Sequence, residues 1–213
     1  MQYIQHEIEN IKNKPYLHLG NNNLSTMHTY LNGFTAALHL LKIENKTDML
    51  LPLPFEFFHD FVSFRYIGQQ SSAGWCRIIL ETNNNDEEAS LKVFFQLHSD
   101  FLDLSIKNCK YSQLSEIERG YHKTHPNVPT RAVAPDFKPE PLFINPIEVY
   151  IIELTSSNCI VLVNTNTSHC LYQRLFGNES EANHFIEQCF GSSLNWVNKK
   201  LNNIKYDREL VLL

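Results

Sequence analysis

The stretch IEVYIIELTSSNCIVLVN (residues 147–164) decides the fold class of this 213-residue chain. Its two ends, 147–154 and 158–164, are rich in β-branched residues, and Thr155-Ser156-Ser157 between them is a turn signal. SHCLYQRLF (residues 168–176) repeats the pattern after a second polar turn. Successive strands joined by short turns pair with their neighbours in the chain, so the sequence predicts an antiparallel meander.

A helix is expected to follow these strands. Apolar residues recur at helical spacing over residues 179–190, and Gly191 follows as a stop signal. Residues 194–201 predict another turn or two of helix, and RELVLL (residues 208–213) predicts a final strand. The C-terminal half is therefore expected to be a three- to four-stranded antiparallel sheet with one or two packed helices.

The N-terminal half has a helical period instead. Ile4, Ile8 and Ile11 predict an amphipathic helix that ends before Pro15. Ser25 is the expected N-cap of a second helix. Gly33 lies inside this second helix, where glycine costs about 1 kcal/mol relative to alanine, so a close helix contact is expected there.

Three more helices are predicted after the prolines at 52 and 54. The aromatic-rich residues 55–66 form the first, and the second starts after Ser71 or Ser72 as its cap. The third runs to about residue 104, with Asn85 as N-cap in a capping-box relation to Glu88. Together these elements predict an α+β fold with a helical N-terminal half.

Six prolines between residues 120 and 146 mark a change in composition. Proline-rich segments with few periodic apolar residues are typical of linkers or extended arms. The sequence thus divides into a helical subdomain (1–119), a linker or arm (120–146) and a sheet-plus-helix subdomain (147–213), with one continuous domain as the alternative.

The composition argues against two classes of partner, nucleic acids and membranes. The net charge is -5 and no cluster of lysine and arginine occurs, whereas binding to nucleic acid phosphates requires such clusters. No run approaches the roughly 20 apolar residues of a membrane helix. The expected partner is therefore neither a nucleic acid nor a membrane.

Cysteine usage and the N-terminus favour a cytoplasmic location. The five cysteines are odd in number, scattered and free of any Cys-x-x-Cys pair, which is typical of free thiols in a reducing compartment. The first 20 residues contain no basic segment followed by an apolar core, so a secretory signal is not expected.

Catalytic signatures are missing from the sequence. It contains no Gly-x-Ser-x-Gly elbow, and its seven glycines form no phosphate-binding pattern. Cys76 is interpreted as a small buried residue, because only Arg77 beside it could activate a thiolate. The hypothesis is that the protein has no catalytic residues and no cofactor.

An alternative hypothesis is a small metal-dependent hydrolase or transferase with a histidine-rich site. Ten histidines invite it, and the candidate ligands are His122, His125, His169 and Cys109. His122 and His125 fall in the proline-rich segment without a supporting zinc motif, so structural or surface histidines are the preferred interpretation.

Acidic residues are the candidate binding residues. Asp86, Glu87 and Glu88 complete a helix start, where carboxylates are favoured by the helix dipole. Together with Asp100 and Asp103 they could present a negative face to a basic partner.

The first half also resembles a family of small bacterial proteins encoded beside polymorphic toxins, including contact-dependent growth inhibition systems. The resemblance covers residues 10–105, about half the chain. It is carried by Lys14-Pro15 with Leu19-Gly20, by Tyr30-Leu31-Asn32-Gly33-Phe34 with Ala37-Leu38, by Phe58-His59-Asp60-Phe61-Val62, by Ser71-Ser72-Ala73-Gly74-Trp75 with Ile79-Leu80, and by Asp86-Glu87-Glu88 with Phe94-Phe95. Tyr16, Leu17 and His18 replace a Gly-Met-Tyr of the family pattern, and residues 120–213 carry no resemblance.

The resemblance implies an immunity protein that binds a cognate toxin domain and covers its active site or substrate surface. It transfers no catalytic residue, because the shared motifs are mostly helix-core positions. The metal enzyme is one rival, and a scaffold that dimerises through the edge of the sheet at residues 147–176 is another. A monomer is the favoured oligomeric state.

Overall fold

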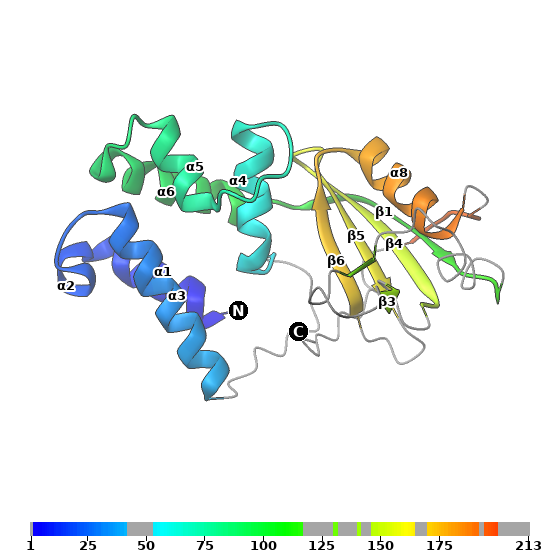
Figure 1. Cartoon of the computed structure of the whole chain (residues 1–213), viewed down its shortest axis with the longest axis horizontal. Helices are drawn as coiled ribbons and strands as arrows, with labels where there is room; N and C mark the ends of the chain where they lie inside the picture. The colour runs from blue at the N-terminus through cyan, green and yellow to red at the C-terminus, as the bar shows by residue number, and fades with distance from the viewer. Residues whose placement is uncertain are drawn as a thin grey trace. The chain divides into compact units, whose positions relative to one another are not determined.

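The computed structural model describes residues 2–41, 53–116, 130–131, 140–141, 146–164, 170–191 and 194–199. The chain forms two compact units, Met1–Leu104 and Ser105–Leu213. The first is helical and the second is built on a sheet, so the α+β prediction is confirmed (Figure 1). The division lies earlier than the expected boundary at residue 119, because a strand at residues 106–113 belongs to the second unit.

The helical unit contains seven helical elements in its described residues. They are α1 (Gln2–Asn13), α2 (Pro15–Leu19), α3 (Leu24–Leu40), the 3-10 helix η1 (Phe55–Phe57), α4 (Phe58–Tyr66), α5 (Trp75–Thr82) and α6 (Glu87–Leu102). Ile4, Ile8 and Ile11 are all buried on one face of α1, as their spacing predicts. None of the helices in the described residues is both long and apolar enough to cross a membrane.

An aromatic core holds η1, α4, α5 and α6 together. It consists of Phe55, Phe58, Phe61, Trp75, Phe94 and Phe101. The fully buried Phe58 ring is central: its centroid lies 5.3 Å from that of Phe94 and 5.5 Å from that of Phe101, both edge-to-face. Such pairs contribute about 0.5–1.5 kcal/mol each beyond the burial of their area.

Two predicted helix caps are wrong, one at the start of α6 and one at the start of α3. Asn85 has a left-handed φ of 59°, and the N-cap of α6 is Asp86, whose side chain accepts from the Ala89 N–H at 2.9 Å. Asparagine tolerates left-handed backbone, so it turns the chain and leaves the extended cap position to the next residue. Ser25 is likewise not a cap, since α3 already begins at Leu24.

The start of α5 also differs from the prediction. Gly74, at a φ of 78°, occupies the N-cap position, and no side chain caps the helix. The Ser71 hydroxyl accepts from the Ala73 N–H at 3.1 Å in the loop before it. The stretch that begins at Ser71 is nevertheless a buried helix start, as expected, because Trp75, Cys76, Ile78 and Ile79 are all buried.

The sheet of the second unit has the order β6-β5-β4-β1-β7 and is antiparallel throughout. Its strands are β1 (Ile106–Gln113), β4 (Glu148–Leu154), β5 (Cys159–Asn164), β6 (Cys170–Phe176) and β7 (Val197–Asn198). The predicted meander is confirmed as β4-β5-β6, but the sheet has five strands instead of the expected three to four, because β1 and β7 pair beside β4. The helix expected over 194–201 is wrong for Val197 and Asn198, which pair with Tyr111 and Lys110 of β1.

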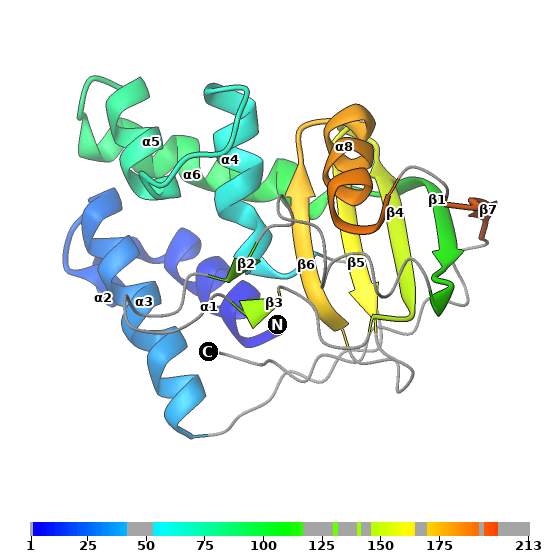
Figure 2. The same cartoon turned by 45° about the vertical axis from the view of Figure 1, so that its right-hand side comes forward.

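Helix α8 (Glu179–Phe190) covers one face of this sheet (Figure 2). Its apolar face, with Phe185 and Ile186, packs on Val149, Ile151 and Val161 of the central strands. The helix ends as predicted, at Gly191 with a φ of 86°. Within the proline-rich segment, β2 (Thr130–Arg131) pairs with β3 (Glu140–Pro141), whereas the predicted strand RELVLL lies outside the described residues.

The expectation of a close contact at Gly33 is wrong. Gly33 is exposed on α3, and a Cβ built on it meets no atom of the described residues within 4 Å. Its cost in helix propensity is therefore not offset by packing.

We predict that Gly33→Ala stabilises the protein by about 0.5–1 kcal/mol, because alanine loses less backbone entropy in a helix. Gly74→Ala is the matched control: its φ of 78° strains any side chain, so it should destabilise by about 1–3 kcal/mol. Urea unfolding of the three proteins measures both effects. A destabilised Gly33→Ala would show that the residue does make a contact.

Candidate functional site

The five acidic residues predicted to bind a partner lie at the two ends of α6. Asp86, Glu87 and Glu88 lie at its N-terminus, whereas Asp100 is in its last turn and Asp103 is its C-cap residue. Glu87 and Asp100 are separated by about 20 Å along the axis, at about 1.5 Å per residue. The structure therefore forms two acidic groups instead of one continuous patch.

Glu87 joins two helices at their N-termini. Its carboxylate accepts from the Ser25 backbone N–H at 2.9 Å and from the Ser25 hydroxyl at 2.6 Å. Cys76 of α5 lies at the same place: burial first, and then the Glu87 charge, raise the pKa of its thiol to about 11. Ser25, Cys76 and Glu87 thus form a junction of α3, α5 and α6, which we call the helix junction.

The other acidic residues are exposed to different degrees. Glu88 is exposed and pairs with Lys92 one turn later at 2.9 Å. Asp100 is partly buried and accepts from the Gln96 amide at 2.8 Å. Asp103 is exposed at the end of the helix. Exposed ion pairs of this type contribute little to stability, so these charges remain available to a partner.

Charge is distributed unequally between the two units. Residues 1–104 contain twelve aspartates and glutamates against seven lysines and arginines, whereas residues 105–213 contain eleven of each. The whole net charge of -5 therefore belongs to the helical unit. A basic molecule would be attracted to this unit in preference to the sheet unit.

A second polar cluster lies where α1, α2 and α3 meet. The Tyr30 hydroxyl donates to Glu7 Oε1 at 2.5 Å, and the Asn10 amide donates to Glu7 Oε2 at 3.2 Å. His18 Nδ1 of α2 lies 3.4 Å from Glu7 Oε1. Burial alone would raise the pKa of Glu7, but the two hydrogen bonds and the neighbouring histidines together lower it. We call Glu7, Asn10, His18 and Tyr30 the Glu7 cluster.

Outward from the Glu7 cluster, α2 presents apolar side chains to solvent. Tyr16 is 67% exposed and Leu17 is 75% exposed. No residue of α2 is buried. Sequence analysis named these two residues only as departures from the family pattern and predicted no binding role for them, because a helix of five residues is too short for a periodic pattern to separate an inner face from an outer one.

Of the four proposed metal ligands, only Cys109 lies within the described residues. His122, His125 and His169 lie outside the described residues. Cys109 is buried on β1, and burial raises the pKa of its thiol to about 11. Among the residues that the structure describes, no three histidine, cysteine or acidic side chains gather in a way that could hold a metal ion.

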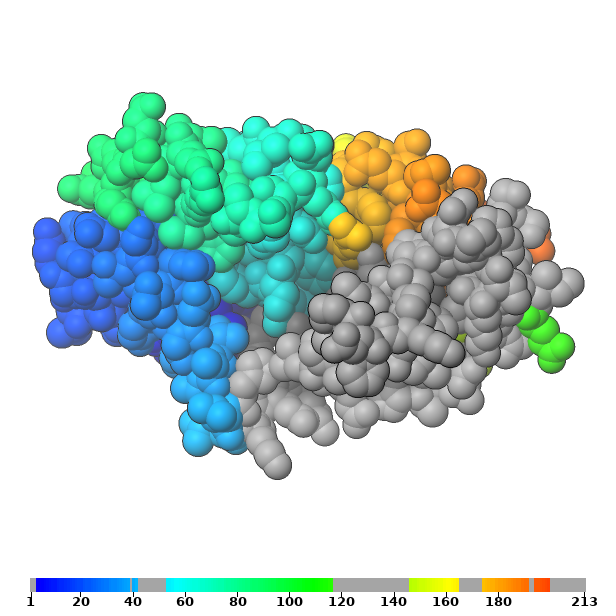
Figure 3. All heavy atoms as spheres, in the orientation of Figure 1, coloured from blue at the N-terminus to red at the C-terminus, as the bar shows by residue number. Residues whose placement is uncertain are grey.

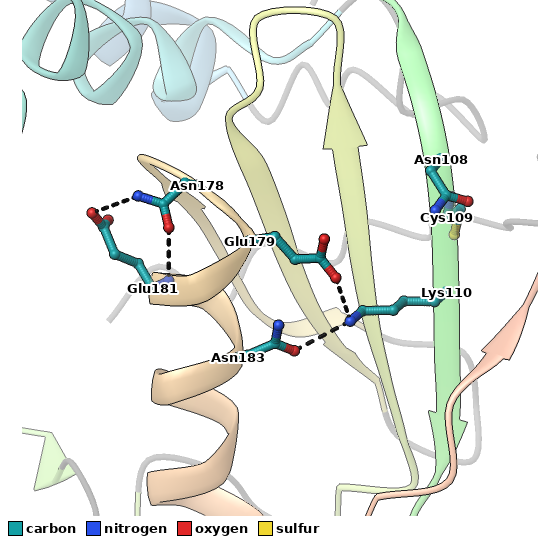
Figure 4. A network of polar contacts seen from close by, with 7 residues as sticks. All are labelled: Asn108, Cys109, Lys110, Asn178, Glu179, Glu181 and Asn183. Atoms are coloured by element: carbon teal, nitrogen blue, oxygen red, sulfur yellow. Dashed lines mark hydrogen bonds and ion pairs between the residues drawn. The ribbon is translucent and has the colours of Figure 1, made fainter.

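The polar network of the sheet unit links α8 to the sheet. Lys110 of β1 donates to Glu179 Oε1 at 2.6 Å and to Asn183 Oδ1 at 3.2 Å (Figure 4). Its ammonium also lies 4.8 Å from the centre of the Trp196 ring. The hydrogen bond from Lys110, together with the Lys110 charge, lowers the pKa of Glu179, whereas its partial burial alone would raise it. This network fixes the helix against β1.

A second lysine attaches the β7 strand. Lys199 donates to the Tyr150 hydroxyl at 2.9 Å, and that hydroxyl donates to Glu148 at 2.7 Å. The Lys199 ammonium also lies over the Tyr111 and Tyr150 rings. Tyr150 is only 3% exposed, and burial raises the pKa of its hydroxyl. The Tyr150 hydroxyl therefore links Lys199, the residue after β7, to Glu148 at the start of β4.

Two histidines are part of the interior of the helical unit. His59 Nε2 donates to the Ser71 carbonyl at 2.6 Å. His98 stacks on Phe94 and its Nε2 is buried without a partner among the described residues. Burial and the charge of Lys12 lower the pKa of His98 to about 4.

Comparison with known proteins does not add a family. The chain matches no family model, no curated protein and no solved structure. The arrangement of its residues is therefore the basis for any functional conclusion.

We predict that four thiols are protected in the native protein. Burial raises the pKa of Cys76 and Cys109 to about 11 and that of Cys159 and Cys189 to about 12. Iodoacetamide at pH 8 followed by peptide mass mapping should leave all four unmodified, and unfolding in urea should make them reactive. Rapid native labelling of Cys109 would instead support the alternative of a reactive or metal-binding site.

We also predict that acid weakens the helical unit through His98. Its pKa is 6.5 when unfolded and about 4 when folded, so the unfolded state binds the proton first and stability falls as the pH drops below 6.5. Between pH 7 and pH 5 this residue costs about 2 kcal/mol.

Urea unfolding of the wild type and of His98→Leu at these two pH values isolates the contribution of this histidine. The wild type should lose about 2 kcal/mol more than the variant. Equal losses in both proteins would show that folding does not lower the pKa of His98.

Proposed function

We propose that this protein is an immunity protein, which binds a cognate bacterial toxin domain in the cytoplasm and covers its active site or substrate surface. The single observation that carries the proposal is the confinement of the net charge to the helical unit. The resemblance over residues 10–105 falls on that same unit.

The charge has a physical use in such a protein. An inhibitor must reach its toxin before the toxin reaches its substrate, and opposite charges raise association rates by steering the encounter. A toxin that acts on nucleic acid needs a basic surface, so an acidic inhibitor is complementary to it. The two acidic groups of α6 supply charge on a rigid helix, which loses little entropy on binding.

Functional groups in the described residues are occupied in ways that suit a binding protein. Glu87 holds the helix junction, Lys110 holds α8, and Lys199 holds β7. The thiols that could act as nucleophiles have raised pKa values because they are buried. The surface that remains exposed to solvent is charged and partly apolar.

The proposal is tested by mixing the purified protein with the toxin domain encoded next to its gene. We expect a stoichiometric complex at micromolar concentration by size-exclusion chromatography, and loss of toxin activity in proportion to the complex formed. Absence of a complex at that concentration would contradict the proposal.

We predict that charge reversal on α6 slows association. Glu88→Lys with Asp103→Lys changes two exposed acids of the helical unit, while Glu116→Lys with Glu187→Lys makes the same charge change on exposed residues of the sheet unit. The first pair should lower the association rate about tenfold at low salt, with a smaller effect at high salt.

Stopped-flow measurements at two ionic strengths compare these variants. Dissociation rates should change little in both, because exposed charges at the edge of an interface act mainly on encounter. The charge account is contradicted if the sheet-unit pair slows association as much as the α6 pair does.

A further inference from the structure

Helix α2 is short, yet two of its apolar side chains are largely exposed to solvent. Its sequence is PYLHL, yet Tyr16 is 67% exposed and Leu17 is 75% exposed. Single exposed apolar residues are ordinary, but Tyr16 and Leu17 are two consecutive, largely exposed apolar residues on a helix with no buried residue. Such surfaces on otherwise polar proteins mark places where another molecule binds.

The helix is held rigid without being buried. Pro15 begins it, and Gly20 ends it in a left-handed conformation at a φ of 72°, with its N–H donating to the Tyr16 carbonyl at 3.0 Å. His18 attaches the other side of the helix to Glu7. These contacts fix the backbone that carries Tyr16 and Leu17, so binding does not have to order that backbone.

The N-terminal acidic group of α6 lies near this helix. Leu19 at the end of α2 is six residues before Ser25, so their Cα atoms are at most about 22 Å apart. Ser25 donates two hydrogen bonds to the Glu87 carboxylate. Figure 3 shows the N-terminal helices, in blue, against the green α5–α6 region within the helical unit. An interface of ordinary size covers about 800 Å² per partner, roughly 30 Å across, so it can include both features.

We infer that Tyr16 and Leu17 are the anchor of the interface with the toxin domain, and that the acidic group at Asp86, Glu87 and Glu88 forms its charged edge. The partner that fits has an apolar pocket for the tyrosine and leucine with lysine or arginine at its rim. Tyrosine is enriched among residues that dominate binding energy, while rim charges mainly affect the association rate. This inference rests on the proposed function and adds the location and chemistry of the contact.

Charge favours a protein partner over the other possible occupants. An anionic bilayer would repel Asp86, Glu87 and Glu88, and a second copy of the chain would bring two helical units of net charge -5 together. A basic protein surface is attracted by the acidic group and by the net charge of the helical unit, and is opposed near the anchor by the exposed Lys12 and Lys14.

The test compares two double variants in binding to the toxin domain encoded next to the gene, by surface plasmon resonance. Tyr16→Ser with Leu17→Ser removes the anchor. Leu40→Ser with Tyr66→Ser is the matched control, because these residues are 86% and 41% exposed on other helices of the same unit. The anchor variant should bind at least a hundredfold more weakly through faster dissociation, and the control should bind within threefold of the wild type. Both should keep the wild-type circular dichroism spectrum, since none of the four residues is buried.

The outcomes separate this inference from the proposed function. If the wild type binds and the anchor variant binds within threefold of it, the anchor is overturned and the proposed function stands. If the wild type does not bind, the proposed function itself is overturned. Binding of the wild type to phosphatidylglycerol vesicles, or self-association in sedimentation velocity, that the anchor variant loses would assign α2 to a membrane or to a second copy and overturn the toxin assignment.

Discussion

The packing of aromatic rings around Phe58 is the constraint on which the helical unit depends. Phe58 is fully buried and contacts rings from η1, α5 and α6, so these elements cannot shift independently. Trp75 extends the cluster to His28 of α3, with ring centroids 5.0 Å apart. Because interiors of this density resist deformation, the outer surfaces of α3 and α6 are presented in a fixed arrangement.

Outside the aromatic core, polar contacts hold the helices of this unit together. The Glu87–Ser25 pair fixes the N-terminus of α6 to that of α3, and the Glu7 cluster fixes α2 to α1 and α3. In each of these contacts a carboxylate accepts hydrogen bonds from neighbouring donors. The same side chains that complete the fold therefore also position the exposed residues to which we assign binding.

Much of the fold follows from local sequence patterns. The meander β4-β5-β6 and helix α8 were predictable because their apolar residues alternate or recur over whole elements. Strand β1 was not, since IKNCKYSQ is a mostly polar strand at one side of the sheet, stabilised by β4 and β7 from distant parts of the chain. Cap positions were missed by one to three residues because several asparagines or serines compete at each helix start.

The candidate site was predictable only in part. The acidic start of α6 is visible in the sequence, but the use of Glu87 to hold Ser25, 62 residues earlier, is a tertiary contact without a local signal. The exposure of Tyr16 and Leu17 is equally invisible, since apolar residues are ordinarily assigned to a core. Catalytic and metal sites have characteristic residue spacings in the sequence, but a binding surface has none. Such a surface is therefore identified from the folded structure.

Hydrogen–deuterium exchange of the protein with and without the toxin domain encoded beside its gene tests the central claim most directly, because it locates the contact surface without any substitution. The account predicts that added protection on binding falls on residues 14–25 and 86–92 of the helical unit, while the backbone of β4 and β5 keeps its exchange rates. Protection confined to the sheet unit would contradict it.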